Sequence, residues 1–126
     1  MTKRHPMFLA GEWAESADPI DIVNPFNGET LGTTFQASRE QVEAAIVAAQ
    51  SVFPSLRATP VYDRVSLLKA LAAKLKERRD EVARTIALEA GKPIRDAEIE
   101  TDRGVFTLET AAEEAKRIEG EVIPLD

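Results

Sequence analysis

The stretch Glu89-Ala90-Gly91-Lys92-Pro93 lies between two long runs in which apolar residues recur at helical spacing. Gly91 can adopt the left-handed backbone conformation that commonly ends a helix, and Pro93 can open the next helix because its ring holds φ near the helical value. We therefore expect a sharp corner that sets the angle between two helices. Glu89 lies beside this corner and is a candidate functional residue.

The chain after the corner predicts one long helix from about Pro93 to Glu119, with Gly120 as its end signal. One face of this helix is marked by Ile94, Ala97, Thr101, Val105, Leu108, Ala112 and Ala115. Residues 121–126 then become extended and predict the start of a strand.

The chain before the corner predicts up to three further helices. Ser38-x-x-Gln41 has the form of a capping box, and the apolar residues that follow recur on one helical face. We expect Pro54 to end this first helix. A second helix begins near Thr59-Pro60, and a third begins near Asp80 and reaches the corner.

The first 35 residues read as short strands and turns. Phe8–Trp13 contains Gly11 at a tight reversal, and Ile20–Val23 alternates as a half-buried strand. Asn24–Gly28 is a strong turn signal that leads into a returning strand over Thr30–Phe35. The predicted fold class is therefore α+β, a single segment over 1–126, with antiparallel strands at about 7–35, three to four helices at about 38–119 and a terminal strand at 121–126.

The composition excludes several classes of function. The formal net charge is −6, and no stripe dense in Lys and Arg suggests nucleic-acid binding. No apolar run approaches the length of a membrane helix, and no export signal is evident, so we expect a cytoplasmic protein without a membrane partner. The chain contains no cysteine, which excludes a thiol nucleophile within these residues.

A complete catalytic set is also missing from the sequence. The single histidine, His5, is expected in a frayed terminus, and no Gly-x-Gly-x-x-Gly or phosphate loop occurs. Glu98 and Glu100 fall on different sides of a helix and cannot act as an acid/base pair. The residues alone therefore do not predict a self-contained enzyme.

The order of these motifs resembles the N-terminal segment of the NAD(P)-dependent aldehyde dehydrogenases. The shared motifs are Phe8-Leu9-Ala10-Gly11-Glu12-Trp13, Val23-Asn24-Pro25 followed by Gly28-Glu29, the Val- and Ala-rich run from Val42 to Ala49, Arg64-Val65-Ser66-Leu67-Leu68, the corner at Glu89–Pro93, Glu100, and Gly120 to Pro124. Each motif is weak alone, but together they match the family in order and spacing from about Phe8 to Asp126.

The resemblance implies an enzyme that oxidises an aldehyde with NAD or NADP and forms a homo-oligomer. In this family the catalytic thiol, the general-base Glu and the nucleotide-binding unit lie beyond this segment. The resemblance thus gives no catalytic or cofactor-binding residue here. The 126 residues alone are expected to bind no NAD(P) and to be inactive, with residues 121–126 beginning an oligomerisation strand.

The resemblance implies two binding sites. The family often holds a monovalent cation with strand carbonyls and a carboxylate, here Ile22, Val23 and Glu89, although Glu89 is also explained as a surface carboxylate at a helix end. Arg103 corresponds to a position that can face the aldehyde and would grip an anionic group, and the alternative for it is an ordinary surface ion pair with Glu100, three residues earlier. Lys92 is read as structural.

An alternative reading needs no catalysis. A free-standing acidic helical module with exposed apolar helix faces could bind a partner helix or dimerise.

Overall fold

We describe a computed structural model of the chain, which covers residues 3–118, 120 and 123. Two antiparallel hairpins come first. Strand β1 (Met7–Leu9) pairs with β2 (Glu12–Ala14), and β3 (Pro19–Val23) pairs with β4 (Thr30–Phe35). Gly11 has a φ of 91° at the first reversal and Gly28 a φ of 74° at the second, as a tight turn requires. The predicted hairpins are confirmed.

Residues 3–5 are held against β4, so the expectation of a frayed terminus around His5 is wrong. The His5 amide donates to the Thr33 carbonyl at 2.8 Å, and the Thr34 hydroxyl donates to the His5 carbonyl at 3.3 Å. The preceding Arg4 forms a two-point ion pair with Glu15 and lies 4.8 Å from the centre of the Phe35 ring. These contacts anchor Arg4 because they join it both to Glu15, just after β2, and to Phe35 of β4.

Four α-helices follow the hairpins: α1 (Arg39–Ala58), α2 (Val61–Glu77), α3 (Arg79–Ala90) and α4 (Ile94–Glu114), with a 3-10 turn η1 (Ala115–Arg117) after α4. The capping box at α1 is confirmed, since the Gln41 amide donates to the Ser38 hydroxyl oxygen and the Ser38 amide donates to the Gln41 side-chain oxygen. The α+β class is therefore confirmed. The predicted terminal strand at 121–126 lies outside the described residues, apart from Ile123.

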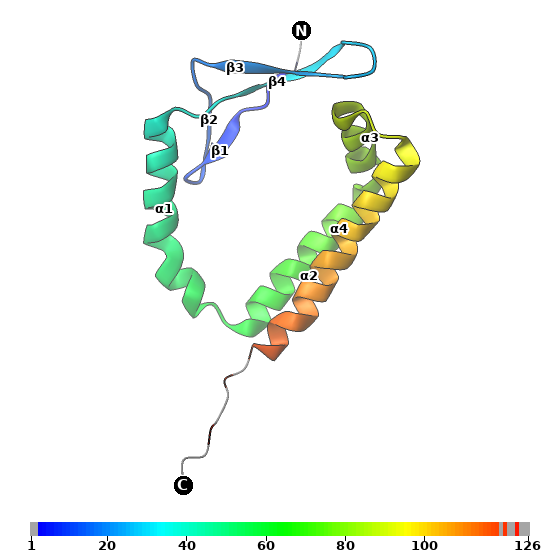
Figure 1. The fold of residues 1–126 in the computed structure, drawn as a ribbon. Helices are drawn as coiled ribbons and strands as arrows, with labels where there is room; N and C mark the ends of the chain where they lie inside the picture. The colour runs from blue at the N-terminus through cyan, green and yellow to red at the C-terminus, as the bar shows by residue number, and fades with distance from the viewer. Residues whose placement is uncertain (1–2, 119, 121–122, 124–126) are drawn as a thin grey trace.

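Pro54 does not end α1, contrary to the sequence prediction. The helix continues past it to Ala58. Proline removes one N–H donor and crowds the preceding turn, which bends a helix but does not always stop it. The ribbon of α1 changes direction in its C-terminal part (Figure 1).

In space the helices form one packed group and one separate helix. Helices α2 and α4 run side by side, and α3 packs against α4 near the β3–β4 hairpin (Figure 1). Helix α1 stands apart from this group, joined to it through the hairpins at one end and the Thr59–Pro60 link at the other. No residue of α1 is buried.

The packed interior is small and consists mainly of alanine. The buried apolar residues among those described are Phe35, Val65, Ala72, Ala83, Ala97 and Ala112, and no large side chain is fully enclosed. Small side chains let α2, α3 and α4 approach closely, but they remove little apolar surface from water. Most of the large apolar residues of α1 and of the hairpins therefore remain exposed.

Candidate functional site

The predicted corner between α3 and α4 is present. Gly91 ends α3 in the left-handed conformation, with φ 65° and ψ 24°. A Cβ atom at this position would lie 2.8 Å from Cγ of Pro25, so the turn between β3 and β4 packs directly onto the corner. Glycine is thus required twice here, once by the backbone and once by the close approach of Pro25.

Pro93 occupies the position just before α4 instead of the first helical position. Its φ of −55° suits the helix start, whereas its ψ of 138° is extended. The Pro93 carbonyl accepts hydrogen bonds from the amides of Asp96 and Ala97 at 3.0 and 3.1 Å. Pro93 therefore begins the hydrogen-bonded turn of α4 although the helix proper starts at Ile94, a shift of one residue at the boundary.

The β3–β4 turn is held by a buried asparagine. The Asn24 side-chain oxygen accepts from the Phe26 amide at 2.9 Å, and the Asn24 carbonyl accepts from the Gly28 amide at 2.8 Å. This side chain fixes the turn that carries Pro25 onto the corner. A hollow of ≈ 390 Å³ lies between the turn and the corner, and its lining includes Phe26 and Ile94.

The residues predicted to bind a monovalent cation come from the two elements that meet at this corner. Ile22 and Val23 end β3, and the strand pairing shifts register between them. Glu89 is exposed in the last turn of α3, two residues before Gly91. The Pro25–Gly91 contact brings the end of β3 and the end of α3 to the same region. Carbonyl and carboxylate oxygens are the donor type that a hard cation takes.

Arg103 lies on the exposed side of α4, and Glu100 lies one helical turn before it. The structure does not form the ion pair between them that would have explained Arg103 as ordinary surface. Instead, the Glu100 carboxylate accepts from Nζ of Lys92 at 2.5 Å. Within the part of the chain that the structure describes, no ion pair involves Arg103. Lys92, which the sequence analysis read as structural, therefore pairs with a residue of α4.

Arg79 joins α3 to α4, an interaction that the sequence analysis missed. Its Nε and Nη2 atoms lie 2.6 and 2.8 Å from the two carboxylate oxygens of Asp102, and Nη2 lies 3.9 Å from Glu98. The hydrogen bonds from Arg79 lower the pKa of the Asp102 carboxyl, and those to Asp102 raise the pKa of the Arg79 guanidinium. No local pattern could reveal this pair because 23 positions separate its members.

Arg64 caps the end of α1, which the sequence analysis also missed. Its Nε donates to the Thr59 carbonyl at 3.0 Å, and its Nη2 donates to the carbonyls of Leu56 and Arg57 at 3.3 and 2.7 Å. The last carbonyls of a helix lack partners within the helix, and a cation also complements the negative end of the helix dipole. Arg64 therefore sets the link between α1 and α2.

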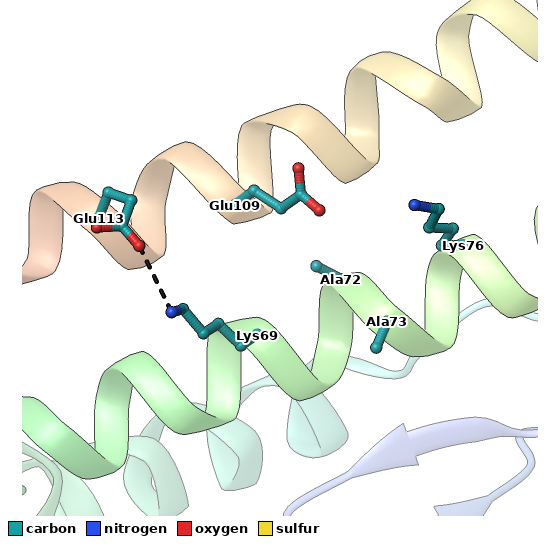
Figure 2. Close-up of a pocket in the computed structure, with 6 residues that line it drawn as sticks. All are labelled: Lys69, Ala72, Ala73, Lys76, Glu109 and Glu113. Atoms are coloured by element: carbon teal, nitrogen blue, oxygen red, sulfur yellow. Dashed lines mark ion pairs between the residues drawn. The ribbon is translucent and has the colours of Figure 1, made fainter.

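A second hollow lies between α2 and α4. It measures ≈ 450 Å³, and its lining consists of Lys69, Ala72, Ala73, Lys76, Glu109 and Glu113. Figure 2 shows Lys69 and Glu113 paired across it, at 3.5 Å, with Glu109 and Lys76 further along the same groove. Its rim carries two positive and two negative side chains, so it gives no preference for a charged ligand.

Nucleotide binding is not supported by the described residues. Their two sheets are antiparallel hairpins, and none of these residues forms a parallel βαβ unit. The described residues thus offer no dinucleotide-binding βαβ unit. Across 3–118, 120 and 123, no group of three or more His, Cys, Asp or Glu side chains is placed to bind a metal.

A search of the same residues finds no helix suited to crossing a bilayer.

Comparison with known proteins decides the family. A sequence model described as the aldehyde dehydrogenase family matches residues 13–126. The chain belongs to the aldehyde dehydrogenase family. Among its relatives, the lactaldehyde dehydrogenase of Methanocaldococcus jannaschii is 34% identical over 120 residues, 95% of this chain. The succinate-semialdehyde dehydrogenase [NADP(+)] GabD of Escherichia coli is 36% identical over 123 residues, 96% of this chain.

Solved structures of aldehyde dehydrogenases show the same fold. Aldehyde dehydrogenase 21 of Physcomitrella patens, in complex with the reaction product succinate, superposes with a TM-score of 0.95 at 36% identity and matches 100% of this chain. Lactaldehyde dehydrogenase of Escherichia coli gives a TM-score of 0.92 at 31% identity. This chain spans 26% of the length of both curated relatives and 26–27% of these two structures. The arrangement of hairpins and helices is therefore that of the corresponding quarter of an aldehyde dehydrogenase.

Proposed function

We propose that this chain is the N-terminal segment of an aldehyde dehydrogenase that oxidises an anionic aldehyde with NAD or NADP. The observation that carries the choice of substrate is Arg103, which is exposed on α4 and forms no ion pair with the described residues. Relatives in the family are named for lactaldehyde, succinate semialdehyde, 3-sulfolactaldehyde and glutarate semialdehyde. Three of these four names denote substrates that carry a carboxylate or sulfonate in addition to the aldehyde group.

In this proposal Arg103 binds and orients the substrate. A guanidinium presents two parallel N–H groups that match the two oxygens of a carboxylate or sulfonate. Holding the far end of the aldehyde limits the positions of its carbonyl carbon, which favours attack by a nucleophile at a fixed place. The chain contains no cysteine, so the thiol nucleophile of the family would lie in the remaining three quarters of the enzyme, together with the nucleotide site.

The test is the substitution Arg103→Leu in the full-length enzyme. We expect KM for succinate semialdehyde to rise about tenfold or more, since a hydrogen bond to a charged group contributes about 1.5–3 kcal/mol. KM for butanal, which lacks the carboxylate, should change little. Arg95→Leu is the matched control, because Arg95 is also an exposed arginine of α4, eight positions earlier. An unchanged KM for the semialdehyde in Arg103→Leu would refute the anion clamp.

We also propose that Glu89 and the carbonyls of Ile22 and Val23 contribute to a monovalent cation site. The contact between Pro25 and Gly91 supports this proposal because it brings the two elements together. Further oxygen ligands would come from the rest of the enzyme. Flame photometry of the purified full-length enzyme should find retained Na⁺ or K⁺, and Glu89→Gln should reduce the amount. An enzyme that retains neither ion would contradict the proposal.

Three features of the enzyme remain predictions. We expect a homo-oligomer located in the cytoplasm, and we expect the 126-residue segment alone to be inactive. The last expectation follows from the missing cysteine and from the absence of a nucleotide-binding unit among the described residues. An assay of the purified segment with an aldehyde and NAD or NADP tests the last expectation directly, and measurable activity of the segment alone would contradict it.

A further inference from the structure

We infer that Lys92 is a positioning residue for the substrate: by holding the Glu100 carboxylate, it leaves the Arg103 guanidinium free to bind an anion. This inference rests on the proposed role of Arg103 and adds a residue that does not touch the substrate. Lys92 lies in the corner between α3 and α4, whereas Glu100 and Arg103 lie on α4. The Lys92 Nζ atom is 2.5 Å from the Glu100 carboxylate.

Glu100 is the carboxylate best placed to occupy Arg103. On a helix, side chains three positions apart lie on the same face and can pair, and an acidic residue that precedes a basic one has the favourable orientation. The structure nevertheless pairs Glu100 with Lys92, eight positions earlier in the chain. The corner makes this possible because Lys92 precedes the first turn of α4.

The other acidic residues near Arg103 are also engaged. Asp102 is bound at two points by Arg79, and Glu98 lies 3.9 Å from the same guanidinium. Thr107, one turn after Arg103, donates its hydroxyl to the Arg103 carbonyl and brings no charge. Two cations from outside α4, Lys92 and Arg79, thus hold the three carboxylates nearest to Arg103 in the sequence.

The Lys92–Glu100 pair also sets the local net charge that an anionic substrate meets. Lys92, Glu100 and Arg103 together carry a net charge of +1, and the charge left unpaired is that of Arg103. Without Lys92, the net charge is zero and Glu100 is free to pair with Arg103. An incoming carboxylate must then displace Glu100 and also approach an uncompensated negative charge, and both effects weaken its binding.

The decisive variant is Lys92→Met in the full-length enzyme, which keeps most of the length of the side chain and removes its charge. We expect KM for succinate semialdehyde to rise about three- to tenfold, with kcat and KM for butanal changed less than about twofold. Lys92→Arg, which keeps the positive charge, should leave KM for succinate semialdehyde at the value of the unmodified enzyme. The double variant Lys92→Met/Glu100→Gln should return KM to that value, because no carboxylate then competes for Arg103.

A binding measurement without turnover complements the kinetics. Titration calorimetry with succinate on the cofactor-free enzyme should show the same order: weaker binding by about three- to tenfold in Lys92→Met and recovery in the double variant. Lys116→Met is the matched control, because Lys116 also pairs with a glutamate of α4, Glu113, at 2.6 Å near the other end of the helix. It should leave succinate binding unchanged.

The outcomes separate this inference from the proposed function. If Arg103→Leu raises KM for the semialdehyde and Lys92→Met does not, the role of Lys92 is refuted and the clamp stands. If neither variant changes KM, both are refuted. A loss in Lys92→Met that the double variant fails to recover would assign Lys92 a purely structural role at the corner, and that result would also overturn the inference.

Discussion

Glycine is required at position 91 for two separate structural reasons. Its left-handed backbone ends α3, and its missing side chain admits Pro25 of the β3–β4 turn. The sequence motif predicted the first demand, because a glycine between two helical patterns is the usual signal for a helix end. It could not predict the second, since Pro25 lies 66 positions earlier in the chain.

The substitution Gly91→Ala should destabilise the full-length enzyme. We expect a loss of about 2 kcal/mol or more, because a left-handed alanine costs about 1 kcal/mol and the contact with Pro25 adds to it. Gly28→Ala is the matched control. It has a similar φ of 74° but no atom within 4 Å of the added Cβ, so it should show the backbone cost alone.

The two effects can be measured separately. Urea unfolding monitored by circular dichroism gives the free energies of unfolding, and the difference between the two alanine variants reports the contact with Pro25. Adding Pro25→Ala to Gly91→Ala should recover that difference. Equal losses in Gly91→Ala and Gly28→Ala would show that the turn yields to the added methyl group without cost.

Among the helices, α1 differs most from what its sequence pattern suggests. Its apolar residues recur at helical spacing, yet Ile46 is 61% exposed and Phe53 is 57% exposed. Periodicity shows that a helix has an apolar face, but it does not show which part of the molecule covers that face. The position of α1 depends instead on polar contacts at its two ends, the Ser38 capping box and the Arg64 cap.

Arg64→Met should release the end of α1 while leaving α2 helical. The carbonyls of Leu56, Arg57 and Thr59 would lose their donor, which corresponds to about 1–3 kcal/mol of local stability. Hydrogen exchange followed by mass spectrometry should show faster exchange over the last turn of α1 and the link to α2. The α3–α4 pair serves as the internal reference, and faster exchange there as well would indicate global destabilisation instead.

The whole chain exposes far more surface than a self-contained domain of its size. Its accessible surface is 10167 Å² for a mass of 13.8 kDa. A folded monomeric protein of this mass exposes about 6,600 Å². The excess agrees with a segment that packs on further parts of an aldehyde dehydrogenase, as its span of 26% of the relatives suggests.

We therefore expect the isolated 126-residue chain to self-associate or to unfold at low temperature. Exposed apolar side chains on α1 and on the hairpins, such as Phe53 and Trp13, favour association because their burial releases water. Light scattering coupled to size exclusion measures the mass, and a thermal melt measures cooperativity. A monodisperse monomer with a cooperative melt at high temperature would contradict this expectation and favour the free-standing module.

The sequence by itself determined the order of elements and the family. Capping at Ser38, the glycine at position 91 and the Asn24–Gly28 turn are local signals, because each acts through hydrogen bonds and torsion angles of neighbouring residues. Local signals also mislead where their strength is limited, as at Pro54, whose single missing donor does not end α1.

Only the tertiary structure decided which side chains meet. The contact of Pro25 with Gly91, the Arg79–Asp102 pair and the Lys92–Glu100 pair each join residues from different segments of the chain. The sequence placed Glu100 beside Arg103 and allowed a pair between them. The folded corner resolved this choice, because it brings Lys92 to Glu100 and leaves Arg103 unpaired within the described chain. The physical reason is that ion pairs depend on distance in space, which spacing along the chain sets only within one helix.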